Sequence, residues 1–294
     1  MAKIGRFSSD EAREAYLRSY EAMEGLWPLP AETADVTTSF GTTHVRRSGA
    51  GDGLPLVLLH GVLGNGLHWH SVVEGLAQGR PVLALDTVGG PGRSVQTAPM
   101  AREADFGTWF AEVLDGLGLE RVHVLGESAG AWHATLVGLY AAERVASVSL
   151  IEPNGVVART PWRALLRLVR FGGDRTEEGW RAMSEWLTPG LTMTEVELAN
   201  VRAGQSFRLA VRWARPLKDA ELASFTPPLL AIYGGASVVS DPPAAQRRIA
   251  VLLPGAEVVV VPGAGHGVRA QAPARVVDRV VRFLVRHDEV PRGG

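Results

Sequence analysis

The chain has 294 residues, of which 46% are hydrophobic, so it is long enough for one α/β domain that carries an insertion. Its 30 lysines and arginines nearly balance 31 aspartates and glutamates, which gives no electrostatic reason to expect nucleic acid or an acidic membrane as a partner. The chain contains no cysteine, which excludes disulfides, thiolate metal sites and a cysteine nucleophile. We therefore expect a small-molecule partner.

Residues 1–10 lack the apolar core of a secretory signal, and no later segment is a charge-free apolar run of about 18 residues. These two observations predict a soluble, cytoplasmic protein that does not bind membranes. The sequence leaves open whether the protein is a monomer or a homodimer.

Residues 1–34 are predicted to form an amphipathic helix and a linker. The helix covers residues 9–25 and ends before Trp27-Pro28, because proline cannot continue a helix. It could pack on the body of the protein or cover a pocket. The apolar side chains that share one face of this helix are Ala12, Ala15, Tyr16, Tyr20 and Met23.

The rest of the chain, apart from one long middle region, alternates short apolar runs with helical stretches. This alternation predicts a mostly parallel eight-stranded sheet with helices on both faces, formed by residues 35–154 and 226–294. The first two strands form a hairpin around Gly41-Thr42, and the last helix lies at about 274–286. The eight predicted strands are 36–40, 43–47, 55–59, 81–85, 121–125, 147–151, 228–233 and 257–261.

Residues 155–225 show helical periodicity and no strand pattern, which predicts a helical lid inserted between two strands of the sheet. Trp162 in this region is a candidate for substrate contact. The same tryptophans could instead pack the interior of a small helical subdomain, since aromatic side chains serve both purposes. The tryptophans of this region are Trp162, Trp180, Trp186 and Trp213.

The segment Gly126-Glu127-Ser128-Ala129-Gly130 places a serine between two glycines, directly after the apolar run 122–125. This pattern is typical of a sharp turn between a strand and a helix that exposes a serine hydroxyl as a nucleophile. A serine hydroxyl needs a base to accept its proton. His266 is the best candidate, because it lies in a glycine-rich loop after the last predicted strand, at the edge where the serine turn also lies.

A second glycine-rich loop, His60 to Gly66, follows the strand at 55–59. The backbone N–H groups of Val62 and Ala129 are expected to form an oxyanion hole. His60 is expected to shape the loop through hydrogen bonds. His68 and His70 flank Trp69 and are expected to line the pocket mouth, with His68 and Trp69 as candidate substrate contacts.

These motifs, together with Asp86 and the Gly-Pro-Gly-Arg-Ser loop that ends at Ser94, resemble the α/β-hydrolase superfamily over about residues 35–288. The resemblance implies the same fold and a serine esterase-like activity. It also implies that Asp86 orders the region beside the site and does not react.

The superfamily usually places a carboxylate after the strand before the last, in order to orient the histidine, but this chain has Ser237 there. Asp241 follows shortly, although Asp-Pro at the start of a helical run is typical of a helix N-cap. Glu152 follows the strand at 147–151 and matches the acid position of the haloalkane dehalogenases that the chain resembles, so we expect Glu152 to orient His266. A site without a working acid also remains open, and Glu127 is expected to support the site from behind.

The sequence therefore predicts a serine hydrolase that cleaves a carboxylic ester or thioester of a small molecule through a Ser128 acyl-enzyme, with no metal or organic cofactor. Acyl transfer or cyclisation, and carbon–carbon bond hydrolysis, remain open on the same fold. So does a receptor that binds small molecules without turnover, because Ser237 replaces the usual acid.

Overall fold

The computed structural model describes residues 3–173, 176–210 and 213–288. Within them one large twisted sheet follows the order β11-β10-β8-β7-β4-β5-β3-β2. The strands from β5 to β11 are parallel, whereas β3 pairs antiparallel with both β5 and β2. The eight strands are β2 (Ala31–Thr38), β3 (Gly41–Ser48), β4 (Leu56–Leu59), β5 (Val82–Leu85), β7 (Val122–Glu127), β8 (Val145–Ile151), β10 (Leu229–Gly234) and β11 (Glu257–Val261).

The predicted mostly parallel eight-stranded sheet is confirmed, and a short strand β6 (Val95–Gln96) adds to it by pairing with β3. The hairpin differs in detail, since its turn lies at residues 39–40 and β2 begins four residues before the predicted boundary at 35. Gly41 lies in β3, where a Cβ atom would be 2.0 Å from the carbonyl oxygen of Val95. The glycine is therefore favoured both by the close approach of β6 and by its own positive φ of 128°.

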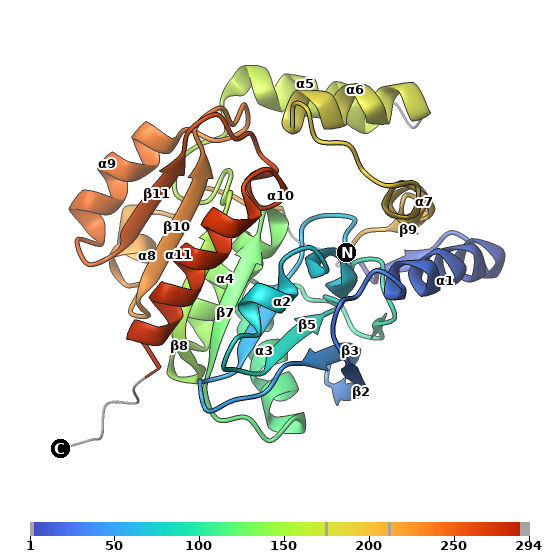
Figure 1. Cartoon of the computed structure of the whole chain (residues 1–294), viewed down its shortest axis with the longest axis horizontal. Coiled ribbons are helices and arrows are strands. Elements are labelled where there is room, and N and C mark those ends of the chain that lie inside the picture. Colours follow the sequence, from blue (N-terminus) through green and yellow to red (C-terminus); the bar gives the residue numbers. More distant parts are fainter. Residues whose placement is uncertain (1–2, 174–175, 211–212, 289–294) are drawn as a thin grey trace.

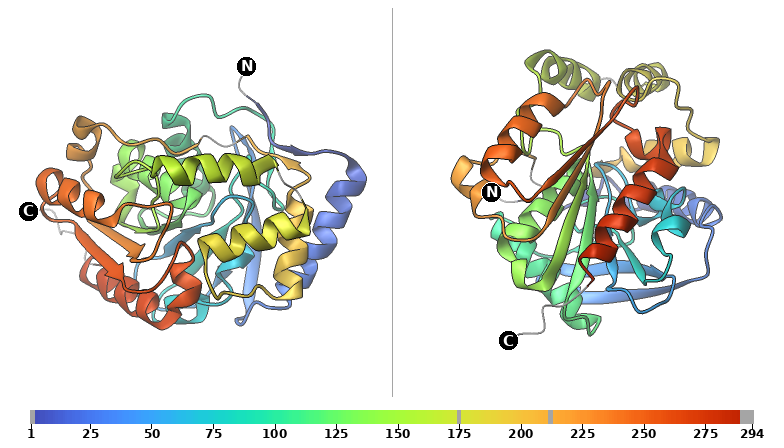
Figure 2. Two further views of the ribbon diagram at one scale, coloured as in Figure 1. Left: turned by 90° about the horizontal axis from the view of Figure 1, so that it is seen from above. Right: turned by 60° about the vertical axis from the view of Figure 1, so that its left-hand side comes forward.

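Helices cover both faces of the sheet (Figures 1 and 2). The strand side chains alternate between two apolar clusters, so that Val57 packs with α3 and α4 while Leu58 packs with α1, α2 and α11. The helices of the main body are α1 (Asp10–Glu24), α2 (Val73–Leu76), α3 (Ala104–Gly116), α4 (Ala129–Tyr140), α9 (Pro242–Leu252), α10 (Val268–Gln271) and α11 (Pro273–Arg286), with short 3-10 turns at Gly66–Trp69 and Ala142–Arg144.

Between β8 and β10 the chain leaves the sheet and forms the inserted segment, residues 155–225. Its helices α5 and α6 lie across the end of the sheet at which β10 and β11 end (Figure 1), and the view from above shows them crossing over it (Figure 2). The segment is not purely helical, because β9 pairs with β1 near the N-terminus. Its elements are α5 (Trp162–Gly173), α6 (Glu177–Leu187), α7 (Glu195–Gly204), β9 (Phe207–Arg208) and α8 (Asp219–Ala223), and β1 is Arg6–Phe7.

The predicted N-terminal helix forms α1, whose N-cap Ser9 accepts a hydrogen bond from the N–H of Ala12. It packs against α7 of the inserted segment as well as on the body. Asn65 bridges α1 and α7. Its side-chain amide donates to the hydroxyl of Tyr16 in α1 at 2.9 Å and to the side-chain oxygen of Asn200 in α7 at 2.9 Å. The N-terminal helix therefore joins the inserted segment to the body.

Candidate active site

Ser128 lies at the sharp turn between β7 and α4, with φ 54° and ψ −115°. A Cβ atom on Gly126 would be 2.1 Å from the carbonyl oxygen of Gly130, and one on Gly130 would be 2.0 Å from that of Leu59. Any larger residue at either position would collide with backbone, so both glycines are required. Within the described part of the chain, the non-glycine residues with positive φ are Leu63, Ser128 and Glu152. All three belong to this site, where such backbone strain tends to gather.

His266 lies in the loop after β11 and reaches the serine, with 3.0 Å between its Nε2 and the Ser128 Oγ. The backbone N–H of His266 donates to the carbonyl oxygen of Leu187, at the end of α6, at 2.8 Å. A Cβ atom on Gly265 would be 2.6 Å from the same carbonyl oxygen. The loop that carries the histidine is therefore fixed partly by the inserted segment.

Glu152 follows β8 directly and is fully buried, with 2.9 Å between its Oε2 and the Nδ1 of His266. Its Oε1 accepts a hydrogen bond from the N–H of Gly234 at 2.6 Å. Its Oε2 also accepts from the hydroxyls of Ser237 at 2.6 Å and Ser240 at 2.9 Å. A buried carboxylate is costly unless hydrogen-bonded, and these donors together with His266 supply the partners that it requires.

The contacts of Glu152 also assign the tautomer of His266. A carboxylate accepts hydrogen bonds only, so Nδ1 of His266 carries the proton that it donates to Glu152. Nε2 is then left with a lone pair facing the Ser128 hydroxyl. The three side chains form one continuous chain of hydrogen bonds, the arrangement that a base-activated nucleophile requires.

Asp241, the alternative acid, caps α9 instead. Its Oδ1 accepts a hydrogen bond from the N–H of Ala244 at 3.0 Å, and Pro242 and Pro243 occupy the first turn of the helix. From the sequence, Ser237 is interpreted only as a missing acid, and the contacts of its hydroxyl and the Ser240 hydroxyl with Glu152 are not predicted. The position of Ser237 at the usual acid site is the signal that points to its contact.

The His60 loop lies beside the nucleophile, since a Cβ atom on Gly61 would be 3.6 Å from the Cβ of Ser128. His60 holds this loop as predicted: its Nδ1 contacts the carbonyl oxygen of Gly61 at 2.8 Å, and its Nε2 accepts from the N–H of Thr87 at 3.1 Å. Burial lowers the pKa of His60, which favours the neutral ring that this pattern needs. Val62 and Ala129 both line one small cavity next to the serine.

Asp86 lies beneath this region and is buried. Its carboxylate accepts hydrogen bonds from the N–H groups of Gly66 and Arg93, each at 2.7 Å. These bonds join the loops after β4 and β5, which agrees with the structural role that the family resemblance implies for Asp86.

Trp69, which the sequence predicts as a substrate contact, lies in the interior of the protein. Its side chain is buried, with 1% of its surface exposed, and the Arg269 guanidinium lies 5.1 Å from the ring centroid. The same guanidinium pairs with Glu127 at 2.8 Å. Glu127 is therefore committed to an ion pair behind the nucleophile, as its predicted supporting role requires.

The two other predicted pocket residues have different surroundings. His68 is partly buried, and burial lowers its pKa to about 3, so its ring is neutral at physiological pH. Trp162 lies at the start of α5 with 66% of its surface exposed, and the Arg163 guanidinium lies 5.4 Å from its ring. The described residues show no hydrogen bond between either side chain and Ser128, His266 or Glu152.

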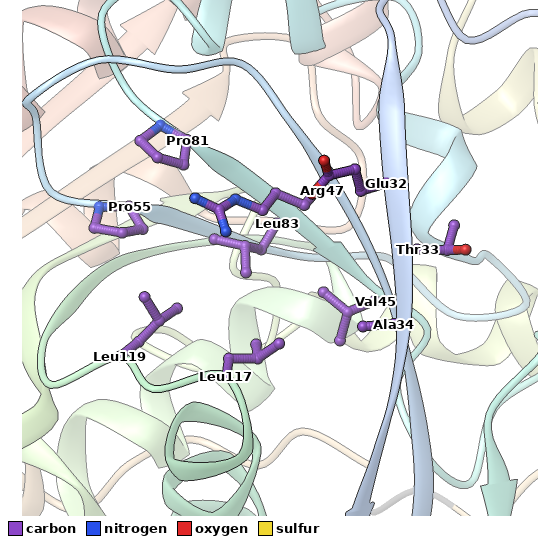
Figure 3. A pocket seen from close by; sticks show the side chains of 10 residues that line it. All are labelled: Glu32, Thr33, Ala34, Val45, Arg47, Pro55, Pro81, Leu83, Leu117 and Leu119. Carbon is purple, nitrogen blue, oxygen red and sulfur yellow. The ribbon is translucent and has the colours of Figure 1, made fainter.

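A separate cavity of about 130 Å³ lies near the amino ends of the strands (Figure 3). Pro55 and Pro81 in its wall precede β4 and β5, so the cavity faces the amino ends of strands whose carboxyl ends approach Ser128. Arg47 and Glu32 are its charged side chains, and it contains no serine or histidine. Ligands of parallel α/β sheets bind at the carboxyl ends, so this cavity is not the candidate active site.

Across residues 3–173, 176–210 and 213–288, no helix is both long and apolar enough to cross a membrane. The same residues contain no group of three or more histidine, aspartate or glutamate side chains arranged to hold a metal ion.

Comparisons with known proteins agree with this geometry. The chain is 29% identical to carboxylesterase YbfK of Bacillus subtilis over 290 residues, which cover 95% of this chain and 96% of that protein. The crystal structure of naproxen esterase from the same organism superposes with a TM-score of 0.86 at 27% identity, covering 94% of this chain and 98% of that one. The model of the alpha/beta hydrolase family matches residues 56–279. The chain belongs to the alpha/beta hydrolase family and is an esterase-like enzyme.

Proposed function

We propose that this protein hydrolyses carboxylic esters or thioesters of small molecules through an acyl-enzyme on Ser128. The observation that carries the proposal is the hydrogen-bond chain from Ser128 through His266 to Glu152, with distances of 3.0 and 2.9 Å. The names of the relatives, carboxylesterase and naproxen esterase, support the same class of reaction.

In the proposed first step, Ser128 Oγ attacks the ester carbonyl carbon while its proton passes to Nε2 of His266. Glu152 stabilises the imidazolium that forms. The carbonyl oxygen becomes an oxyanion, which the N–H groups of Val62 and Ala129 bind. The tetrahedral intermediate then collapses, the bond to the leaving alcohol or thiol breaks, and Nε2 gives its proton to that group.

In the second step, water replaces the leaving group. Nε2 of His266 takes one proton from the water molecule as the water oxygen attacks the acyl carbon. When the ester bond to the serine breaks, Nε2 gives this proton to Ser128 Oγ. The products are a carboxylic acid and the free enzyme. No metal ion or organic cofactor takes part in these steps.

We also propose that the inserted segment, residues 155–225, acts as a lid over the site. Helices α5 and α6 cross one end of the sheet (Figure 2). Ser128 directly follows β7 and His266 lies in the loop after β11, at the ends of parallel strands on that side. The exposed Trp162 on α5 and the neutral His68 beside the His60 loop are the proposed substrate contacts.

A fluorophosphonate probe and a panel of fluorogenic esters test the proposal, with Ser128→Ala as the control. We expect one probe molecule per chain on Ser128, no labelling of Ser128→Ala, and ester hydrolysis that is lost in the variant. Hydrolysis that Ser128→Ala retains would contradict the mechanism. Tight binding of small molecules without labelling would favour a receptor. Transfer of the acyl group from Ser128 to an added alcohol faster than to water would favour an acyltransferase.

A further inference from the structure

Next to the nucleophile lies a small cavity of about 10 Å³, which is lined in part by Val62, Ala129, Thr87 and His133. Val62 and Ala129 are the proposed oxyanion donors, so an ester whose carbonyl oxygen they bind would have its acyl group beside this cavity. A volume of this size accommodates about one water-sized group.

Two of the lining residues have buried polar atoms without a partner. His133 is 3% exposed and Thr87 is 1% exposed. Neither ring nitrogen of His133, nor the hydroxyl of Thr87, has a hydrogen-bond partner within the described residues. Buried polar atoms are nearly always paired, so a polar group that entered this cavity would meet donors and acceptors that are not otherwise used.

His133 is fixed in place and uncharged. Its ring stacks on Phe106, with 4.5 Å between the ring centroids and 17° between the planes. Burial lowers the pKa of His133 to about 3, so the ring is neutral at physiological pH. A neutral imidazole donates from one nitrogen and accepts at the other, and a threonine hydroxyl does both. The pair is therefore suited to a hydroxyl group, which also donates and accepts.

We propose that this cavity is a subsite for a hydroxyl group on the carbon next to the ester carbonyl, so that the preferred substrates are esters of 2-hydroxy acids. The inference rests on the proposed function, since it concerns the acyl group that Ser128 would accept. A hydroxyl fits the cavity in size and pairs with the unsatisfied atoms of Thr87 and His133. A methyl group of similar size leaves them unpaired, and a methoxy group is larger than the cavity.

Three fluorogenic esters of one alcohol test the inference: glycolate, propionate and methoxyacetate. Glycolate and propionate match in size, while methoxyacetate reproduces the electron withdrawal of the glycolate oxygen without its hydroxyl. We expect kcat/KM for glycolate to exceed that for each of the others by about 10- to 100-fold, the effect of leaving buried polar groups unpaired. Equal kcat/KM values for glycolate and propionate would overturn the subsite.

Two variants then locate the effect. We expect His133→Phe and Thr87→Val each to reduce the preference for glycolate by about tenfold, because each removes hydrogen-bonding atoms from the cavity. Thr135→Val is the matched control, since its buried hydroxyl bonds to the Ala131 carbonyl oxygen at 2.8 Å and does not line the cavity. Circular dichroism checks folding, and Thr87→Val carries the test if His133→Phe does not fold.

The outcomes separate the two proposals. Hydrolysis of all three esters without a preference overturns the subsite and leaves the proposed function intact. A preference that survives both Thr87→Val and His133→Phe also overturns the subsite. Failure to hydrolyse any ester, with no fluorophosphonate adduct on Ser128, overturns both.

Discussion

The segments that follow β8 and β10 start next to each other at the same edge of the sheet, yet they contribute differently to His266. The segment after β8 provides a carboxylate, Glu152. The last residue of β10 and the loop that follows it provide hydrogen-bond donors to that carboxylate: the Gly234 N–H and the hydroxyls of Ser237 and Ser240. The charge lies on one strand end and its hydrogen-bond partners on the other. An acid can therefore move between neighbouring strands while the histidine stays in the same place.

The largest expected effect separates the two carboxylates. We expect Glu152→Gln to lower kcat by about 10²- to 10⁴-fold, because an amide cannot stabilise the imidazolium or fix its tautomer. Asp241→Asn should leave kcat unchanged, since asparagine caps a helix as well as aspartate does. Steady-state kinetics on the best ester of the panel measure both. Equal small effects would mean that the comparison between the strand ends is wrong.

Returning the acid to the other strand end sharpens the comparison. We expect Glu152→Gln combined with Ser237→Asp to recover about tenfold of the activity lost by Glu152→Gln alone, a fraction of what a well-placed acid supplies. Ser237→Asp alone is the control. It should be less stable to urea than the unchanged protein, because it puts two carboxylates side by side. A double variant no more active than Glu152→Gln would show that position 237 cannot serve His266.

A smaller effect is expected from the donors themselves. Ser237→Ala removes one hydrogen bond to Oε2 of Glu152 and leaves the Ser240 hydroxyl and His266 in contact with it. We expect kcat to fall about three- to tenfold with KM unchanged, as for one hydrogen bond to a charged group. Thr188→Ala is the control that also removes one hydroxyl, since the Thr188 hydroxyl donates to the Ser184 carbonyl oxygen at 2.8 Å. A change in KM without a change in kcat would point to substrate contact instead.

The smallest effect concerns the cap. Asp241→Ala removes the acceptor for the Ala244 N–H and should lower the free energy of unfolding by about 1 kcal/mol, as N-cap removal usually does. Activity at 25 °C should be unchanged. Urea unfolding measures the first quantity and ester hydrolysis the second. A loss of activity larger than the fraction unfolded would reopen a role for Asp241 at the site.

The sequence predicts the sheet because its strands are short apolar runs with clear borders, such as 56–59, and it predicts the serine turn because Gly126 and Gly130 have no substitute there. Other features depend on neighbours that are distant in sequence. The burial of Trp69 is not predicted, because Arg269, whose guanidinium lies over its ring, is 200 residues away in the sequence. Gly41 is predicted to form the hairpin turn, although it lies in β3. Its close contact with the Val95 carbonyl oxygen is not predicted, because β6 has only two residues and gives no clear strand pattern. The Ser240 contact with Glu152 depends on the path of the loop after β10.

The bond between the His266 N–H and the Leu187 carbonyl joins two main-chain atoms. Side-chain substitutions in α6 cannot remove it directly, so an alanine scan of this helix would not detect it. The inserted segment can therefore exchange its side chains, and with them the surface that it presents, while its attachment to the histidine loop persists.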